Sequence, residues 1–237
     1  MIAQDLQIKI FADGADRLGI LSLHADPLIR GFTTNPTLMR KTGVKDYEAF
    51  ARDILEVVHD RPISFEVMAD DFAEMERQAL KIASWGDNVY VKVPVTNTNG
   101  DRSDRLIVRL ADQRVKLNVT ALMTVEQTEW VADCLVDGPP ACISIFAGRI
   151  ADTGRDPIPI MAQALEVIRP AGNIELVWAS PREVLNILQA DAIGCHIITV
   201  THGLLEKLPT LGRDLTEFSL ETVRMFHRDG EAAAYSV

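Results

Sequence analysis

The fold is decided by residues 63–95, ISFEVMADDFAEMERQALKIASWGDNVYVKVPV, which have the pattern of a strand, a helix and a second strand. The apolar residues of the middle part recur every three or four positions, which is the period of one helical face. They are Phe72, Met75, Ala79, Ile82 and Ala83. The last part, VYVKVPV (89–95), is apolar at nearly every position, as is typical of a strand buried on both sides of a sheet. One charged residue, Lys92, interrupts this apolar run.

The same alternation of β-rich and helical segments continues from end to end of the chain. The eight expected strands are IKIFAD (8–13), GFTTNP (31–36), ISFEVMA (63–69), VYVKVPV (89–95), KLNVTAL (116–122), CISIFAGR (142–149), IELVWAS (174–180) and CHIITVT (195–201). Repeated β–α alternation predicts parallel strands with right-handed crossovers. Eight such units in 237 residues predict an α/β fold with a single (β/α)8 TIM-barrel domain over residues 1–237. An open doubly wound sheet is the alternative, because periodicity alone does not establish closure.

Composition limits what such a domain can bind. Hydrophobic residues make up 47% of the chain, and no apolar run approaches the roughly 18 residues that cross a membrane. The net charge of −10 argues against general nucleic-acid binding, because phosphate backbones attract basic surfaces. The first residues, MIAQDLQIKIFADGAD, lack the basic start and apolar run of a secretory signal, so we expect a cytoplasmic protein.

Cysteines and histidines give no sign of a metal centre in the sequence. Cys134, Cys142 and Cys195 form no CxxC pair, and we expect them to be buried apolar side chains outside any disulfide. The five histidines show no HExxH-type spacing. The sequence therefore predicts no metal site.

Polar residues stand at the end of almost every expected strand. In (β/α)8 barrels the carboxyl ends of the strands form the active-site face. We therefore expect these side chains to line one mouth, although each of them alone has an ordinary structural explanation. They are Asp13, Thr33, Thr34, Asn35, Glu66, Lys92, Asn118, Thr120, Ser144, Arg149, Ser180, Arg182, Thr199 and Thr201.

Lys92 is the most informative of these residues, because its strand carries no other charge. A lysine buried in such a strand is costly to keep ionised without partners. Burial favours the neutral amine, which is the nucleophile that attacks a ketone. A second interpretation stays open, in which a buried Lys92 pairs with Asp13 or Glu66 for structure only.

Asp13 and Glu66 are carboxylates that end the first and third expected strands. Two carboxylates in one pocket can hold different protonation states and so divide the acid and base roles. The structural alternatives are that Asp13 caps the turn beside Gly14 and that Glu66 forms only a salt bridge with Lys92.

Arg149 and Arg182 follow the sixth and seventh strands, and late strands of such barrels often carry a phosphate site. Guanidinium groups match phosphate oxygens, but solvated surface charge remains the alternative. We expect Ser180 to be the N-cap of a helix that begins at Pro181, whose free N–H groups would also suit a phosphate. Asn35 precedes a proline and either projects its amide into the mouth or organises the turn.

The chain resembles the transaldolase family, including the short subfamily that contains fructose-6-phosphate aldolase-like enzymes. The resemblance runs from FAD (11–13) to THGLLEKL (201–208), and TTNP together with KVP at this separation is its most specific sign. The matching segments are GFTTNPTL (31–38), VYVKVPVT (89–96), LNVTAL (117–122), SIFAGRI (144–150) and WASPRE (178–183).

The resemblance implies a role for each of the polar residues. Lys92 would be the Schiff-base lysine, and Asp13 would be the acid/base at the C4 hydroxyl of the donor. Glu66 and Thr120 would hold the catalytic water. The residues implied for substrate binding are Asn35, Asn118 and Ser144 at the dihydroxyacetone part and Arg149, Ser180 and Arg182 at the phosphate. No metal or organic cofactor is implied, because the lysine adduct polarises the substrate.

Two positions bear on the activity within the family. The aldolase branch has Gln where this chain has Glu66 and Tyr where it has Phe146, so both positions resemble transaldolase. The resemblance therefore implies transfer of dihydroxyacetone from sedoheptulose 7-phosphate or fructose 6-phosphate to an aldose phosphate, as in the pentose phosphate pathway. The chain length resembles the short subfamily, whose members often form ring-shaped decamers, so a homo-oligomer is expected.

Three alternatives to a transaldolase remain open at this point. The first is an aldolase that releases dihydroxyacetone, and the second is a sugar-phosphate-binding barrel without turnover. The third is an enzyme of nucleotide-sugar or secondary metabolism that uses the same lysine on another ketose. The segments FADGAD (11–16) and VTHG (200–203) differ from the usual family pattern and motivate this third alternative.

Overall fold

Eight parallel strands close into a barrel. The computed structural model describes residues 5–234, and within it each strand pairs with the next and β8 pairs with β1. The strands are β1 (Lys9–Asp13), β2 (Ile29–Thr33), β3 (Ile63–Glu66), β4 (Val89–Pro94), β5 (Leu117–Leu122), β6 (Ala141–Ile145), β7 (Ile174–Trp178) and β8 (Ile197–Thr201). This closure confirms the predicted (β/α)8 barrel and excludes the open sheet.

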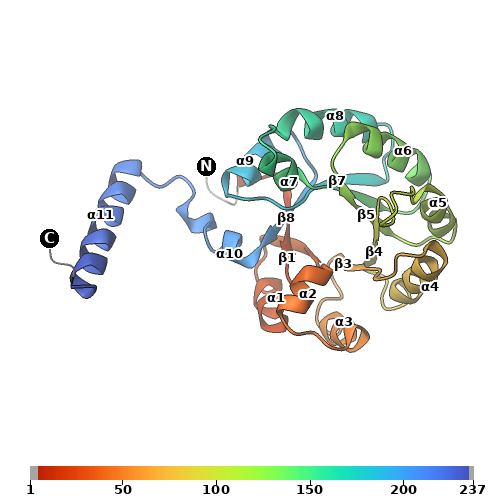
Figure 1. The fold of residues 1–237 in the computed structure, drawn as a ribbon, viewed down its shortest axis with the longest axis horizontal. Helices are drawn as coiled ribbons and strands as arrows, with labels where there is room; N and C mark the ends of the chain where they lie inside the picture. Colours follow the sequence, from red (N-terminus) through yellow and green to blue (C-terminus); the bar gives the residue numbers. More distant parts are fainter. Residues whose placement is uncertain (1–4, 235–237) are drawn as a thin grey trace.

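The helices surround the barrel, except for the last one, which lies away from it (Figure 1). They are α1 (Arg17–His24), α2 (Pro36–Lys41), α3 (Tyr47–Leu55), α4 (Phe72–Ala83), α5 (Asp104–Asp112), α6 (Val125–Leu135), α7 (Ala147–Asp152), α8 (Ile158–Ile168), α9 (Leu185–Ala192), α10 (His202–Leu205) and α11 (Leu215–Ala232), with the 3-10 helix η2 (Leu208–Thr210). Two short helices, α2 and α7, begin inside the segments 31–36 and 142–149 that were expected to be strands. The helix predicted from the apolar spacing in 72–83 is present as α4, which buries Met75, Ala79 and Ile82.

The strands divide their side chains between the inside of the barrel and the surrounding helices. Residues two apart along a strand share a face. Deep inside the barrel an apolar cluster is formed by Phe11, Cys142, Val177 and Ile197. Two positions further along these strands stand Asp13, Ser144 and Thr199, which line a cavity at the mouth. The mouth of the barrel is therefore polar above an apolar floor.

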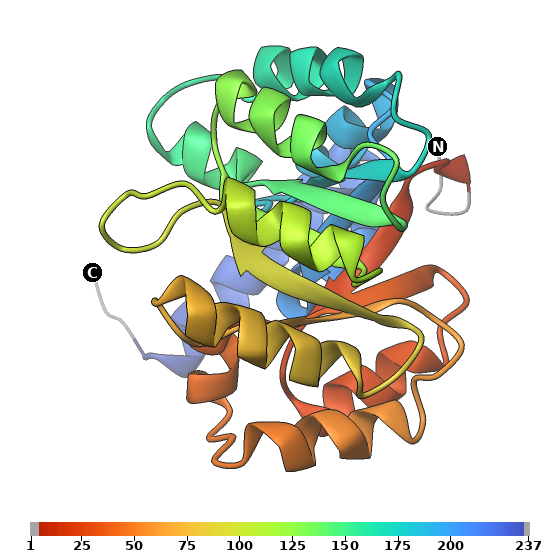
Figure 2. The ribbon, with the colours of Figure 1, turned by 90° about the vertical axis from the view of Figure 1, so that its right-hand side faces the viewer.

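The loops at the carboxyl ends of the strands lie on one side of the molecule. Figure 2 shows the barrel from the side, with the loop between β4 and α5 projecting beyond the strands. Helix α7, which follows β6, meets the segment after β7 at Gly148, where an added Cβ would lie 1.6 Å from the carbonyl oxygen of Ser180. No side chain larger than hydrogen fits at this contact, so the glycine allows the helix and the segment to approach closely.

Helix α9 begins at Leu185 rather than at Pro181, so the predicted N-cap at Ser180 is wrong. The backbone of Ser180 has φ 61°, in the left-handed region, whereas an N-cap has extended backbone. The side-chain oxygen of Asn186 accepts the N–H groups of Arg182 at 2.7 Å and Glu183 at 3.1 Å. These bonds hold the segment before α9 in an irregular turn. The N–H groups expected for a phosphate at a helix start are therefore not presented there.

The helices that follow the eighth strand do not all pack on the barrel. After β8 the chain makes only the four-residue α10 and then η2, where Pro209 stands in the first turn. The long helix α11 follows, but it lies away from the barrel (Figure 1) and none of its residues is buried. Beneath α10, a hollow of about 390 Å³ is lined by Leu23, Leu28, Ile29, Leu205, Leu208 and Leu211 among others.

The cysteines match their expected place. Cys142 and Cys195 are buried, Cys134 is half-buried, and all three are free thiols. Burial raises the pKa of the Cys142 and Cys195 thiols to about 12, which keeps them unreactive. In the described part of the chain, residues 5–234, no three His, Cys, Asp or Glu side chains gather as metal ligands. Over the same residues, no helix combines the length and apolar character required to cross a membrane.

Candidate active site

A cavity of about 500 Å³ opens at the carboxyl ends of the strands. Its walls include nine of the ten residues predicted for the site, which are Asp13, Asn35, Glu66, Lys92, Thr120, Ser144, Arg149, Ser180 and Arg182. The tenth, Asn118, is buried beside it and supports the wall. The structure therefore brings together residues that are spread over 170 positions of the sequence, from 13 to 182.

The Lys92 amine lies at the bottom of this cavity. Its residue is only 7% exposed, and its Nζ donates to the backbone carbonyl of Thr34 at 3.0 Å. The nearest oxygen of Glu66 lies 3.1 Å from the same Nζ, because β3 and β4 place these two residues side by side. The ion pair considered from the sequence is thus present. The amine also faces a cavity, which a purely structural pair does not require.

Asp13 lies in the same cavity within a set of hydrogen bonds. The hydroxyl of Thr33 donates to its Oδ1 at 2.8 Å, and the amide of Asn35 donates to its Oδ2 at 3.3 Å. Burial raises the pKa of the Asp13 carboxyl, although the charge of Lys92 and these hydrogen bonds oppose the rise. A raised pKa brings a carboxylate closer to the range in which it exchanges protons at neutral pH.

The sequence left open whether Asp13 and Asn35 only cap or organise turns, and the structure answers differently for each. The first helix is capped by Asp16, whose side chain accepts from Gly19, so Asp13 is not its cap. Asn35 is the N-cap of α2, since its Oδ1 accepts the N–H of Leu38 at 3.0 Å. Its Nδ2 still points to Asp13. The one amide therefore both organises the turn and faces the cavity.

Thr120 reaches the cavity through an irregularity in β5. The register between β5 and β6 shifts between Val119 and Leu122, and Ala121 has φ 68°. A residue that carries a Cβ is strained in this left-handed region, and such strain is common at functional sites. The Oγ1 of Thr120 is buried, and within residues 5–234 no hydrogen-bond partner reaches it. A buried hydroxyl of this kind suits a water or a ligand hydroxyl.

Asn118 acts through its neighbours. Its Nδ2 donates to the hydroxyl of Ser64 at 3.1 Å, and its Oδ1 accepts from the hydroxyl of Ser144 at 2.7 Å. All three residues are buried. This chain across β3, β5 and β6 fixes the orientation of Ser144, which lines the cavity.

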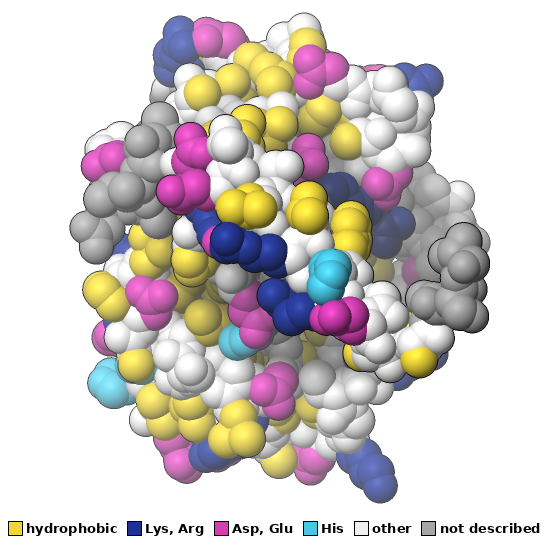
Figure 3. All heavy atoms as spheres, turned by 90° about the vertical axis from the view of Figure 1, so that its left-hand side faces the viewer, with side chains coloured by type: hydrophobic (Ala, Val, Ile, Leu, Met, Phe, Trp, Pro, Cys, Tyr) yellow, Lys and Arg dark blue, Asp and Glu magenta, His cyan; other side chains and the backbone are white. Residues whose placement is uncertain are grey.

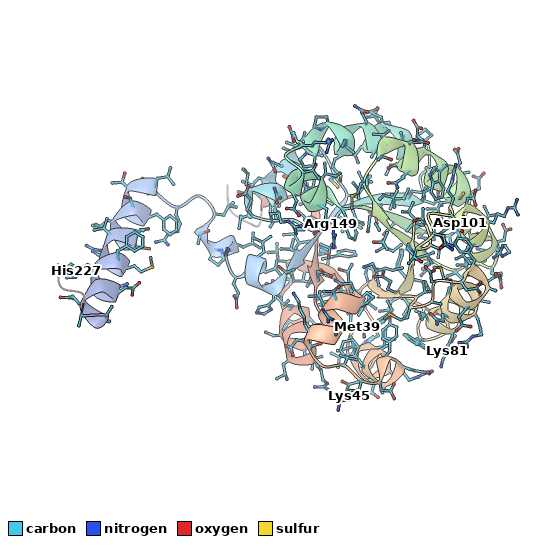
Figure 4. The ribbon with its side chains drawn as sticks, viewed as in Figure 1. Met39, Lys45, Lys81, Asp101, Arg149 and His227 are labelled. Carbon is cyan, nitrogen blue, oxygen red and sulfur yellow. The ribbon has the colours of Figure 1, made fainter. Side chains whose placement is uncertain are left out.

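The two arginines stand at the rim. Arg182 donates through Nε to Asp152 at 2.9 Å and through Nη2 to the same carboxylate, while its Nη1 donates to the hydroxyl of Ser180 at 2.9 Å. Hydrogen bonding to Arg182 holds the pKa of Asp152 below its usual range. Arg149 is exposed on α7, with its guanidinium carbon 5.7 Å from the centre of the Phe146 ring (Figure 4). The rim therefore carries two cations, one of them already paired.

Sequence reasoning gave no role to some residues that shape the site. The hydroxyl of Thr33 contacts that of Thr199 as well as Asp13, so Thr33 bonds this carboxylate directly and Thr199 supports Thr33. Their positions on β2 and β8, which flank β1, were the signal for this contact. Asp152 was missed as well, although it follows Arg149 by one helical turn. No sequence signal linked it to Arg182, because that contact depends on how two loops pack.

Comparison with known proteins agrees with this geometry. A solved structure of dihydrodipicolinate synthase from Rhodopseudomonas palustris matches 84% of this chain and 71% of its own, with a TM-score of 0.53 and 15% identity, which shows the fold alone. A probable transaldolase of Dehalococcoides mccartyi is 31% identical over 202 residues, 85% of this chain and 90% of the relative. One of Streptococcus equi subsp. zooepidemicus is 33% identical with the same coverage. The transaldolase/fructose-6-phosphate aldolase family profile matches residues 10–237, so the chain belongs to this family.

Proposed function

We propose that this protein is a transaldolase, which transfers a dihydroxyacetone unit from sedoheptulose 7-phosphate or fructose 6-phosphate to an aldose phosphate through a Schiff base on Lys92. The observation that carries the proposal is a nearly buried amine that faces a polar cavity, 3.1 Å from Glu66. Family membership supports the same chemistry. We further propose that the whole chain acts as one barrel domain in the cytoplasm, within the pentose phosphate pathway.

The first stage joins the donor to the enzyme. The amine of Lys92, after its proton has passed to Glu66 or to water, adds to the C2 carbonyl of the ketose, and loss of water from the carbinolamine gives an iminium ion. This dehydration needs a proton on the leaving hydroxyl. Glu66 stands beside the amine, and the unpartnered hydroxyl of Thr120 opens on the same cavity, so both can hold the water that relays this proton.

Asp13 carries the carbon–carbon cleavage. Its carboxylate takes the proton of the C4 hydroxyl, the C3–C4 bond breaks, and the electron pair passes to the iminium nitrogen. The products are an enamine on Lys92 and an aldose phosphate. The raised pKa of Asp13 suits this base role near neutral pH.

The enamine then completes the transfer. Its C3 attacks the aldehyde carbon of the acceptor, Asp13 returns the proton to the new hydroxyl, and water hydrolyses the iminium ion to release the new ketose. Phe146 lines the cavity and has no proton to donate to C3 of the enamine. The intermediate is therefore expected to persist until an acceptor aldehyde arrives.

The two rim arginines are the proposed phosphate site. Arg149 and Arg182 are both at the cavity, and the Nη1 of Arg182 reaches the hydroxyl of Ser180. This hydroxyl can accept from Arg182 and donate to a phosphate oxygen at the same time. The dihydroxyacetone end would lie deeper, near Asn35 and Ser144, with Asn118 holding Ser144.

The covalent step is tested by trapping. Treating the enzyme with fructose 6-phosphate and borohydride should reduce the Schiff base and add the three-carbon or six-carbon unit to the peptide that contains Lys92, as read by mass spectrometry. The Lys92→Ala variant should stay folded, form no adduct and lose transfer activity by at least 1,000-fold, on the order of the losses seen when a nucleophile is removed. A fold without turnover would bind the sugar and give no adduct, and variant activity within tenfold of the parent would exclude the covalent role.

Release of free dihydroxyacetone separates a transaldolase from an aldolase. With fructose 6-phosphate alone we expect slow release, and with erythrose 4-phosphate added we expect fast formation of sedoheptulose 7-phosphate. The Phe146→Tyr variant should raise the release rate, because a phenol placed at this wall can protonate the enamine. Release by the parent that is faster than transfer would identify an aldolase instead.

The phosphate site is tested at Arg182. We expect Arg182→Ala to raise the KM for fructose 6-phosphate at least tenfold, which corresponds to about 1.4 kcal/mol of lost binding. The KM for the non-phosphorylated donor, fructose, should change less than twofold. Arg155→Ala, in the loop after α7, is the control that removes the same charge away from the cavity, since the Nη1 of Arg155 donates to the hydroxyl of Thr153. If Arg182→Ala raised the KM for both donors equally, Arg182 would not bind the phosphate.

We infer that the protein is a homo-oligomer built through α11. This helix leaves apolar side chains in water, with Leu215 80% and Phe226 64% exposed. Figure 3 shows the side of the molecule on which α11 lies, where yellow apolar side chains lie among charged ones. The hollow beneath α10 is apolar as well. A second copy that lays its α11 against this barrel would cover both surfaces, which water penalises when they stay exposed.

The assembly is tested by charge on the apolar positions of α11. The double variant Val223→Glu and Phe226→Glu should shift the molar mass in light scattering from an oligomer to a monomer of 26.2 kDa. Arg224→Glu, between them on the same helix, is the matched control and should keep the parent mass. A parent that is already monomeric at micromolar concentration, or a double variant that keeps the oligomer, would contradict this role of α11.

A further inference from the structure

The hydroxyl of Tyr47 contacts the main chain of Glu66 twice. It accepts the N–H of Glu66 at 2.7 Å and donates to the carbonyl oxygen of the same residue at 2.9 Å. Tyr47 is the first residue of α3, outside the barrel, whereas the Glu66 carboxylate points to Lys92 inside it. A helix side chain thus supplies the pair of hydrogen bonds that a neighbouring strand would normally supply to β3.

The neighbouring strand cannot supply them here. Strand β2 donates to β3 from Phe32 and Thr34, with the N–H of Thr34 bonded to Ser64 at 3.1 Å. In a regular parallel ladder, the next bonds would run from the N–H of Glu66 to the carbonyl of Thr34 and from the N–H of residue 36 to the carbonyl of Glu66. Residue 36 is Pro36, which has no N–H.

The carbonyl of Thr34 is used elsewhere. It accepts the Nζ of Lys92 at 3.0 Å, in place of the N–H of Glu66. Lys92 therefore holds an acceptor that the ladder would otherwise occupy. The exchange is possible because the hydroxyl of Tyr47 satisfies the N–H of Glu66 instead. Without this hydroxyl the N–H of Glu66 would lack an acceptor at a part-buried place, which is unfavourable.

We propose that Tyr47 is a positioning residue for Lys92: by replacing β2 at Glu66, its hydroxyl leaves the Thr34 carbonyl free to orient the reacting amine. This proposal rests on the proposed Schiff-base function and adds a residue to it. Among the residues that the structure describes, Tyr47 is not one that lines the active-site cavity. It acts only through the end of β3, which carries Glu66, and through the acceptor that it leaves to Lys92.

The position of the Tyr47 hydroxyl is fixed by its surroundings. Its ring packs edge-on against Trp85 at 5.5 Å and against Phe65 at 6.2 Å between ring centres. The start of α3 is fixed by Asp46, whose side chain accepts the N–H of Ala49. Figure 4 marks the adjacent Lys45 at the outer surface of the molecule, near the start of α3. Burial raises the pKa of the Tyr47 phenol, which keeps its proton available for the Glu66 carbonyl.

Removing only the hydroxyl is the sharpest change, because Tyr47→Phe keeps the ring and its contacts with Trp85 and Phe65. Without the hydroxyl, the N–H of Glu66 regains the Thr34 carbonyl by ladder geometry, and Lys92 loses one of its two acceptors. The amine then points less consistently at the ketose carbonyl. Proximity and orientation contribute strongly to such steps, so adduct formation should slow while binding of the sugar phosphate stays the same.

The experiment measures adduct formation by rapid mixing with fructose 6-phosphate followed by a borohydride quench, with mass spectrometry of the Lys92 peptide. We expect Tyr47→Phe to form the adduct at least tenfold more slowly, with a half-saturating concentration within twofold of the parent. Tyr90→Phe is the matched control, because it removes a half-buried phenol from β4, two residues from Lys92, and should behave like the parent. Melting temperatures of all three proteins establish that the comparison is made on folded enzyme.

Crystal structures of the parent and Tyr47→Phe complete the test, since they do not depend on activity. We expect the Thr34 carbonyl to bond the N–H of Glu66 in the variant, with the Nζ of Lys92 moved out of its reach. A Lys92–Thr34 contact unchanged in the variant would overturn the proposal. So would a rate of adduct formation within twofold of the parent, or a variant in which only the half-saturating concentration of fructose 6-phosphate changes. A parent that forms no adduct would instead overturn the Schiff-base function, and the two structures would still decide the role of Tyr47.

Discussion

An amine enclosed in a closed barrel must find acceptors, and the acceptors of Lys92 come from two other strands. The carbonyl of Thr34 and the carboxylate of Glu66 both lie within about 3 Å of its Nζ. In a regular ladder the carbonyl of Thr34 would already accept the N–H of Glu66. The early departure of β2 at Pro36 and the hydroxyl of Tyr47 together make room for this arrangement. The arrangement around Lys92 thus goes with the absence of ladder hydrogen bonds between the end of β2 and Glu66.

Around this amine the cavity is organised in layers. An apolar floor closes the barrel below, the carboxylates of Asp13 and Glu66 lie at the level of the amine, and the arginines stand at the rim. Desolvation at the bottom works against charge, as the raised pKa of Asp13 shows, while the rim stays in contact with water. A ligand with a carbonyl at one end and an anion at the other matches this gradient. The two lower layers result from the two-residue period of the strands, which places successive inward side chains at successive depths. The arginines of the rim come from α7 and from the segment before α9.

Much of this was predictable from local patterns. The eight strands and the polar residues at their ends follow from periodicity and from short segments such as VYVKVPV (89–95). The start of α9 was not, because the side chain of Asn186 accepts the N–H groups of Arg182 and Glu183, which a helix beginning at Pro181 would have left to a cap at Ser180. The separation of α11 from the barrel was not predictable either, since its helical period is the same wherever it packs. The role of Tyr47 could not be predicted, because its partner Glu66 lies on another element, 19 residues away. No local sequence pattern shows where the hydrogen-bond ladder between two strands ends.

The contact between Gly148 and Ser180 has a thermodynamic consequence for recognition at the rim. Arg149 follows Gly148 directly, and Arg182 lies two residues after Ser180, so the backbones that carry the two guanidinium groups are in contact. Their spacing is set when the chain folds and does not have to be restored each time an anion arrives. Most of the loop-ordering entropy is therefore spent during folding, and a bound anion has to restrict little more than the two side chains.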